Sequence, residues 1–180
     1  MKSQIYKQIE SVFRNSTSQD ELFDSFGDAI NGGIEDFELY KILLANPHLS
    51  IDEIKMYTEK LLRQIPLSTY HILMWTAKIL ESHAYAFSNL DDPIVYYERA
   101  LNSRPIEFEP HLSLIRLYSH DVETEFNKKI LELVENNVSR VNRKSKVYYA
   151  LADLYKRRGD TRNESKYLFL AEKSAEVERE

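Results

Sequence analysis

The sequence predicts an all-α fold, a stack of antiparallel helical hairpins with about ten helices. Only four glycines and five prolines interrupt its 180 residues. Between these breakers apolar residues recur every three or four positions, as in Ile5, Ile9 and Val12, and sustained strand alternation is missing. One glycine, Gly27, falls inside such a stretch and weakens the pattern there. The connections are short, so neighbouring helices should pack against each other.

The expected helices have signals at their ends. Ser/Thr-x-x-Glu capping boxes begin three of them, at Ser18, Ser50 and Thr161. Glycines end two, at Gly33 and Gly159. With the prolines, these signals place helices at 3–14, 18–30, 35–45, 50–64, 68–86, 92–103, 108–119, 122–137, 144–158 and 161–177.

Composition narrows the class of protein. Hydrophobic residues make up 43% and charged residues 29%, which is typical of a soluble globular protein. The chain has no cysteine, which excludes disulfides, thiolate metal sites and cysteine nucleophiles. No apolar run approaches the roughly 20 residues of a membrane helix, and the N-terminus has no apolar signal core. We therefore expect a cytoplasmic protein.

Charge is unevenly distributed along the chain. The net charge is −5, yet residues 140–180 hold 11 Lys and Arg against 7 Asp and Glu. An acidic chain gains little from counterion release on DNA, so bulk nucleic-acid binding is not favoured. The basic region is interpreted either as a solvated face or as a patch for an acidic peptide or RNA.

A repeat lies in the second half of the chain. The stretch from His111 to Tyr118 aligns with the stretch from Tyr148 to Tyr155, with Leu, Leu and Tyr at matching positions. The period is 37 residues, a spacing typical of stacked helical hairpins.

The second copy resembles a tetratricopeptide repeat (TPR). Leu151, Ala152 and Tyr155 lie on one face of its first helix, Gly159 makes the turn, and Ala171 lets the second helix approach. Residues 92–105, Asp-Pro-Ile-Val-Tyr-Tyr-Glu-Arg-Ala-Leu-Asn-Ser-Arg-Pro, resemble the second helix and terminal proline of a preceding repeat. The resemblance implies an α-α superhelix with a concave groove. An unrelated all-helical bundle with a similar periodicity is the alternative.

This sequence also departs from the TPR pattern. Glu164, Pro93 and Ile115 stand where small residues are usual, and the first copy needs an insertion around 83–89. The resemblance covers about 69–178. The expected organisation is a set of degenerate N-terminal hairpins over 1–67, followed over 68–180 by repeats at about 69–107, 108–144 and 145–178.

Residues that carry chemistry are sparse. The five histidines do not have metal-ligand spacing, and the nucleophile-elbow and phosphate-loop glycine motifs are missing. Paired carboxylates such as Asp91-Asp92 fall at helix starts, where the macrodipole favours them. We therefore expect no enzyme, no metal and no cofactor.

In a TPR-like register, tyrosines off the packing face enter the groove, where an exposed ring can anchor a peptide. The groove residues that the resemblance implies are Tyr70, Arg116, His120, Lys146, Tyr149, Asp153, Lys156 and Arg157. The implied function is a non-catalytic adaptor or scaffold that binds a protein or peptide, possibly acidic. The positions of a chaperone-tail clamp carry Leu112 and Ala150 instead, so that ligand is not expected.

Two alternatives stay open. Residues 37–65 loosely resemble a helix-turn-helix whose second helix carries Lys55, Lys60 and Arg63, which would make the chain a nucleic-acid-binding regulator, as would the basic C-terminal region. The last expected helix, 161–177, either caps the stack or pairs with another copy of the chain.

Overall fold

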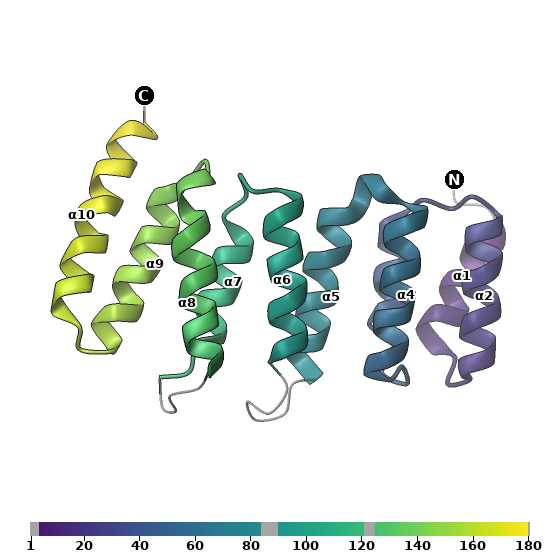
Figure 1. Cartoon of the computed structure of the whole chain (residues 1–180). Helices are drawn as coiled ribbons and strands as arrows, with labels where there is room; N and C mark the ends of the chain where they lie inside the picture. The colour runs from purple at the N-terminus through teal and green to yellow at the C-terminus, as the bar shows by residue number, and fades with distance from the viewer. Residues whose placement is uncertain (1–3, 84–89, 121–124, 180) are drawn as a thin grey trace. The chain divides into compact units, whose positions relative to one another are not determined.

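A computed structural model describes residues 4–83, 90–120 and 125–179. Over these residues the chain forms ten α-helices and two 3-10 turns, with no strand (Figure 1). The helices pack in neighbouring pairs, which confirms the all-α prediction. The chain divides into two compact units, Met1–His83 and Ala84–Glu180, and each unit is described by itself.

The first unit forms two layers. α1 contacts α3 and α3 contacts α5, so these three helices follow one another in one layer, while α2 packs on α1 and α4 packs on α5. Its elements are α1 (Gln4–Asn15), α2 (Gln19–Asn31), α3 (Phe37–Leu44), α4 (Ile51–Gln64), η1 (Pro66–Ser68) and α5 (Thr69–His83).

Aromatic rings fill the core of the first unit. Phe26 lies 5.9 Å from the ring of Tyr40 and 4.9 Å from that of Tyr57, and Phe13 lies 6.4 Å from Tyr40. The hydroxyl of Tyr40 donates to the carbonyl of Ile34, which satisfies a polar atom inside an apolar cluster. Burial raises the pKa of Tyr40 to about 12, with Asp36 and Glu35 adding to the effect.

Two buried polar links join helices of the first unit. Asn46, in the turn after α3, donates from Nδ2 to the carbonyls of Phe13 and Ser16, each at 3.0 Å. Phe13 lies in the last turn of α1 and Ser16 directly follows the helix, where intrahelical partners run out. Thr58 of α4 and Thr76 of α5 share a hydrogen bond of 2.9 Å, and both are fully buried. Each link holds a pair of helices in register.

The second unit has the same two-layer plan. α7 contacts α9 in one layer, α6 contacts α8 in the other, and α9 and α10 form an extensive hairpin (Figure 1). Its elements are α6 (Asp91–Ser103), α7 (Glu109–Leu117), α8 (Glu125–Asn137), η2 (Val138–Arg140), α9 (Lys144–Arg157) and α10 (Thr161–Val177).

A shared carboxylate ties three helices of the second unit together. The rings of Tyr155 on α9 and Tyr167 on α10 are stacked, 5.4 Å apart and 8° from parallel. Both hydroxyls donate to Oε1 of Glu135 on α8, at 2.8 and 2.7 Å. Burial and the hydrogen bond to Glu135 raise the pKa of both tyrosines, so both stay protonated donors.

The helix ends agree with most of the predicted signals. Ser50 forms the complete capping box, and Ser18 caps α2 through its own hydroxyl. The prediction at Thr161 is wrong by one residue, because the carboxylate of Asp160 accepts from the backbone N–H of Asn163 and is the cap of α10.

Glycines end α2 and α9 as expected. Gly33 and Gly159 have φ of 67° and 72°, in the left-handed region that favours glycine. After each one, the next N–H bonds back to a carbonyl inside the helix, Ile34 to Ala29 and Asp160 to Tyr155. This is the Schellman arrangement.

Some predictions differ from the structure or lie outside it. The expected second region began at 68, whereas α5 packs on α3 and α4 and belongs to the first unit. The expected helix parts at 84–86 and 122–124, and most of the insertion near 83–89, lie outside the described residues. None of the described helices is long and apolar enough to cross a bilayer.

Candidate functional site

Five of the predicted groove residues share one exposed face of α9. Their spacing of three, four, three and one residues keeps them on one side of a helix with 3.6 residues per turn. Tyr149 is 45% exposed although its ring is large, and its four companions are exposed too. The five are Lys146, Tyr149, Asp153, Lys156 and Arg157.

The charges on this face of α9 have local partners. The guanidinium of Arg157 lies 2.7 Å from the carboxylate of Asp153, in an exposed pair one helical turn apart. The ammonium of Lys146 lies 4.1 Å from the ring centre of Phe108, the residue that precedes α7. Lys156 lies on the same face, two helical turns after Tyr149. For its ammonium the structure gives no ion pair or ring contact among the described residues.

Two more of the predicted residues, Arg116 and His120, lie in or shortly after α7, in the same unit as α9. α7 packs on α9, and Arg116 is exposed near the end of α7. His120 follows that helix, and its ring lies 5.1 Å from the ring of Tyr118. The structure adds Arg158, whose guanidinium lies 5.7 Å from the same tyrosine ring and 5.5 Å from Tyr155. Arg158 belongs to the basic region 140–180 but is not among the predicted groove residues.

Tyr70 does not belong to this set. It is 8% exposed, and it lies in the first unit, at the start of α5. The expectation of an exposed ring is wrong because α5 is buried around most of its circumference, including Ile72, Leu73 and Met74. A helix with so wide an apolar surface has little room for an open face at its first turn.

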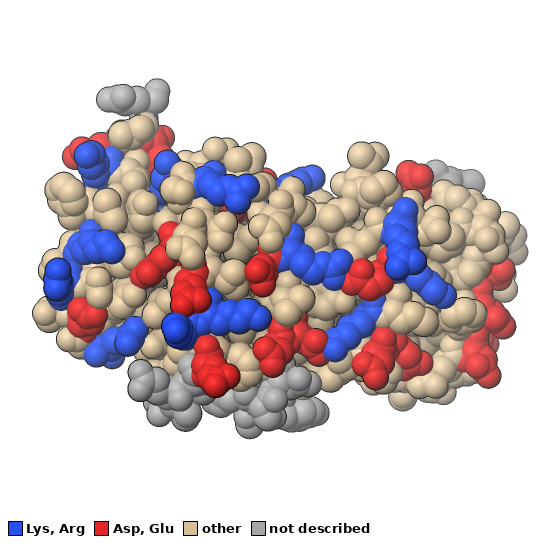
Figure 2. Space-filling model, viewed as in Figure 1, with Lys and Arg blue, Asp and Glu red and all other residues tan. Residues whose placement is uncertain are grey.

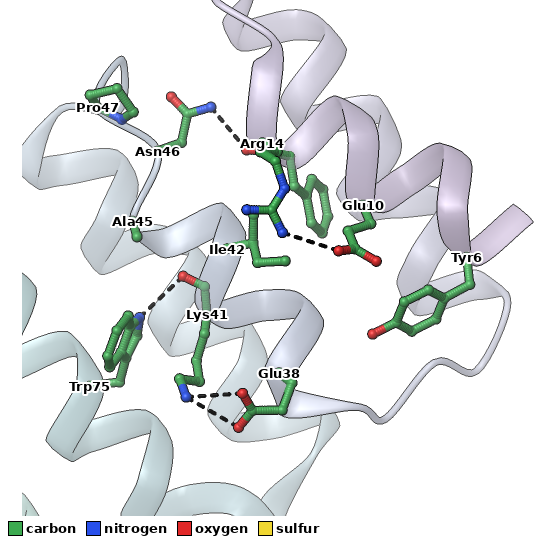
Figure 3. A pocket seen from close by; sticks show the side chains of 11 residues that line it. Tyr6, Glu10, Arg14, Glu38, Lys41, Ile42, Ala45, Asn46, Pro47 and Trp75 are labelled. Atoms are coloured by element: carbon green, nitrogen blue, oxygen red, sulfur yellow. Dashed lines mark hydrogen bonds and ion pairs between the residues drawn. The ribbon is translucent and has the colours of Figure 1, made fainter. Parts of the chain in front are cut away.

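The first unit also contains a groove that the sequence did not predict. It has a volume of about 520 Å³, and it lies along α1 and α3 with one wall from α5 (Figure 3). A second hollow of about 420 Å³ shares Glu38, Lys41 and Trp75 with it. The lining residues of the groove are Tyr6, Glu10, Phe13, Arg14, Glu38, Lys41, Ile42, Ala45, Asn46, Pro47 and Trp75.

Charged side chains along this groove are paired with each other. Arg14 lies 3.1 Å from Glu10 on α1, and Lys41 lies 3.0 Å from Glu38 on α3 (Figure 3). The ammonium of Lys41 also lies 4.9 Å from the ring centre of Trp75, whose indole N–H donates to the carbonyl of Lys41 at 3.2 Å. The groove therefore presents an aromatic wall on one side of two ion pairs, with the Glu38–Lys41 pair next to the ring (Figure 3).

Hydrogen bonds hold the walls of the groove in place. The hydroxyl of Tyr6 donates to Oδ2 of Asp36 at 2.6 Å, and Oδ1 of Asp36 caps α3 by accepting from the N–H of Glu38. At the other end, Asn46 fixes the turn after α3 to the end of α1. The lining side chains thus come from helices whose ends are tied together, as a preorganised site needs.

Charges are mixed on the side of the molecule that Figure 2 draws. On the side of the molecule drawn in Figure 2, Lys and Arg lie among Asp and Glu over α8 to α10. This side therefore does not present a surface of one charge sign to a partner. The described residues also contain no cluster of three or more side chains with metal-ligand chemistry.

The helix-turn-helix alternative concerned α3 and α4. The ammonium of Lys60 on α4 lies 4.4 Å from the ring of Phe23 and 5.9 Å from that of Phe26, both on α2. Lys60 is half-buried against a neighbouring helix. A reading helix directs its cations into a groove of DNA, whereas Lys60 lies over two rings of α2. The nucleic-acid alternative itself stays a prediction.

Comparison with known proteins gives no family for the chain. No protein-family model, no curated protein and no solved structure matches it.

Proposed function

We propose that this protein is a non-catalytic adaptor, a TPR-like array of helical hairpins that binds an extended segment of a partner protein. The observation that carries the proposal is the groove along α1, α3 and α5, with Trp75 in its wall. Grooves of this size lined by aromatic rings and a few fixed polar groups are typical binding sites. Their residues stand on helices, which gives a more precise surface than loops do.

The contents of the groove suggest how a segment binds. An apolar side chain of the ligand packs on Trp75 and Ile42 and displaces water from them. Polar groups of the ligand then exchange with the pairs Glu10–Arg14 and Glu38–Lys41 at the edges. Since these pairs are already formed, little side-chain entropy remains to be lost on binding.

The exposed face of α7 and α9 is the second contact surface in this proposal. Tyr149 supplies a ring with few rotatable bonds, and Lys156 lies on the same helix face. An acidic stretch of the same partner is drawn to this basic region, which raises the rate of association more than the affinity.

A peptide-display selection on the purified chain tests the proposal. The groove variant is Ala45→Arg, which places a long side chain at an exposed position of the lining, and Gln8→Arg adds the same charge to α1 away from the lining. We expect selected peptides to bind Ala45→Arg at least about tenfold more weakly, and Gln8→Arg unchanged. Peptides that bind Ala45→Arg like the wild type would remove the groove from the proposal.

The α9 surface is tested separately, with peptides that consist of an acidic stretch. The double variant Lys156→Glu/Arg157→Glu should slow association, and Arg162→Glu/Lys173→Glu on α10 should leave it unchanged at equal net charge. Capture from a lysate with and without nuclease treatment tests the alternative that the chain binds nucleic acid. Species that vanish with nuclease, together with a steep salt dependence, would favour the regulator instead.

A further inference from the structure

A separate pocket opens between α2 and α4, on the layer of the first unit that does not form the groove. Its volume is about 290 Å³, which is enough for one large side chain. It shares no lining residue with the groove. Rings and aliphatic atoms form its floor, and polar side chains of the last turns form its rim. The lining residues are Phe23, Phe26, Gly27, Ile30, Asn31, Lys60, Arg63 and Gln64.

Gly27 has no structural reason to be a glycine. It lies in the interior of α2, where glycine weakens a helix relative to alanine. Its φ is not in the left-handed region, and a Cβ built there would meet nothing within 4 Å. Neither backbone conformation nor close packing therefore demands it. What the missing side chain does provide is open space beside the pocket.

The rim of the pocket is cationic. Lys60 lies over Phe23, which is 47% exposed, and Arg63 lies one helical turn nearer the end of α4. Among the described residues neither Lys60 nor Arg63 has an ion pair. The acidic residues of α2 do not line the pocket. Figure 2 shows Lys and Arg side chains over α4, with Asp and Glu side chains beside them.

We propose that this pocket binds a partner segment in which a large apolar side chain is followed by an acidic one. The apolar side chain enters beside Gly27, between Phe23 and Ile30, and the carboxylate pairs with Lys60 and Arg63. Charge complementarity selects this occupant, since two cations that have no ion pair among the described residues flank the apolar lining. The site is distinct from the groove and goes beyond the adaptor function proposed for it.

Capped tetrapeptides test the proposal on the full chain. Acetyl-Ala-Phe-Glu-Ala-amide is compared with the same peptide carrying Gln for Glu and with one carrying Ala for Phe. The readout is the shift of backbone amide signals in a nuclear magnetic resonance titration. We expect saturable shifts at Gly27 and Lys60 with a dissociation constant of about 1 mM or tighter. The Gln peptide should bind about threefold more weakly, and the Ala peptide should not saturate.

Variants at Gly27 separate binding from folding. Gly27→Ala should raise the melting temperature, because alanine stabilises a helix relative to glycine. It should also lower the affinity for the Phe-Glu peptide, because the added methyl group takes up space in the pocket. Gly27→Leu should abolish saturable binding, whereas Asp28→Leu adds the same side chain outside the lining and should keep it. Lys60→Gln should remove the preference for Glu over Gln.

Three results would overturn the proposal. The first is the absence of saturable shifts at Gly27 and Lys60 in the wild type. The second is equal binding of the Glu and Gln peptides, or unchanged binding by Gly27→Leu. The third is binding of free 3-phenylpropanoate while neither Phe-containing peptide binds, which would make the pocket a small-molecule site. The adaptor function is tested at Ala45, so its failure leaves this result unaffected.

Discussion

The two units use the same devices at their helix ends but different cores. Each unit ends a helix with a left-handed glycine, and each uses a buried asparagine to bind backbone groups, Asn46 in the first and Asn127 in the second. The first core is an aromatic cluster whose buried tyrosine hydroxyl has a partner. The second encloses His111, which is fully buried, and neither ring nitrogen has a hydrogen-bond partner among the described residues.

The two cores differ in a titratable group, the imidazole of His111. Backbone groups of Glu107 and Asn137 approach the ring of His111 without meeting the geometry of a hydrogen bond, and they only partly offset burial, which lowers its pKa to about 4. A buried imidazole of this kind stays neutral in the folded chain and charges when the chain unfolds. Two units with the same plan thus differ in how acid affects them.

The largest expected effect is on the first core. Phe13→Ala removes a fully buried ring beside Tyr40 and should cost about 3–5 kcal/mol of the free energy of unfolding. Hydrogen exchange should show the loss in residues 4–83, with amides of the second unit as the internal reference. A cost below about 1 kcal/mol would mean that the aromatic cluster repacks around the gap.

Acid should act on the second unit. The pKa of His111 is lowered to about 4 in the folded chain, so its neutral form stabilises the fold above the usual pKa near 6.5. That stability is lost as the pH falls from about 6.5 to about 4, by roughly 3 kcal/mol when complete. Hydrogen exchange along a pH series measures it, and His111→Leu should flatten the series. An equal slope in His111→Leu would assign the acid sensitivity to other groups.

The two asparagines should have similar effects in different units. Asn46→Ala leaves the carbonyls of Phe13 and Ser16 without their side-chain donor and should cost about 2 kcal/mol. Asn127→Ala removes a pair of hydrogen bonds to the backbone of Ser119, at 2.8 and 3.0 Å, and should cost about as much. Urea unfolding of the single and double variants measures both costs. Costs that fail to add would show that the two sites are coupled.

The smallest effects belong to the glycines, and they have opposite signs. Gly27→Ala should stabilise the first unit by about 0.5–1 kcal/mol, since the position is helical and open. Gly159→Ala should destabilise the second by about 1 kcal/mol, because φ there is 72°. Thermal unfolding measures both. Two changes of the same sign would contradict the conformational argument.

Helix positions could be predicted because their signals are local. Serine caps and glycine stops act over one turn, and the expected helices therefore agree with the observed ones to within a few residues. The cap of α10 was placed one residue late because Asp160 and Thr161 are both good capping residues and stand side by side. Sequence alone does not decide between them.

The candidate sites were harder to predict. The face of α9 follows from helical periodicity within one segment, so Tyr149 and Lys156 were expected to be exposed, and they are. The groove is formed by α1, α3 and α5, which are far apart in the sequence and of which only α5 had a repeat motif. Tyr70 was misplaced for the same reason, since its burial depends on helices that its own segment does not reveal.

The single tryptophan of the chain is Trp75, and it forms part of the groove wall. Its half-buried indole therefore makes the groove visible in ultraviolet emission without any label. A ligand that displaces water from the ring should move the emission to shorter wavelengths, whereas a ligand confined to α9 should leave the spectrum unchanged. One native chromophore thus distinguishes an occupied groove from an occupied helix face in an ordinary cuvette.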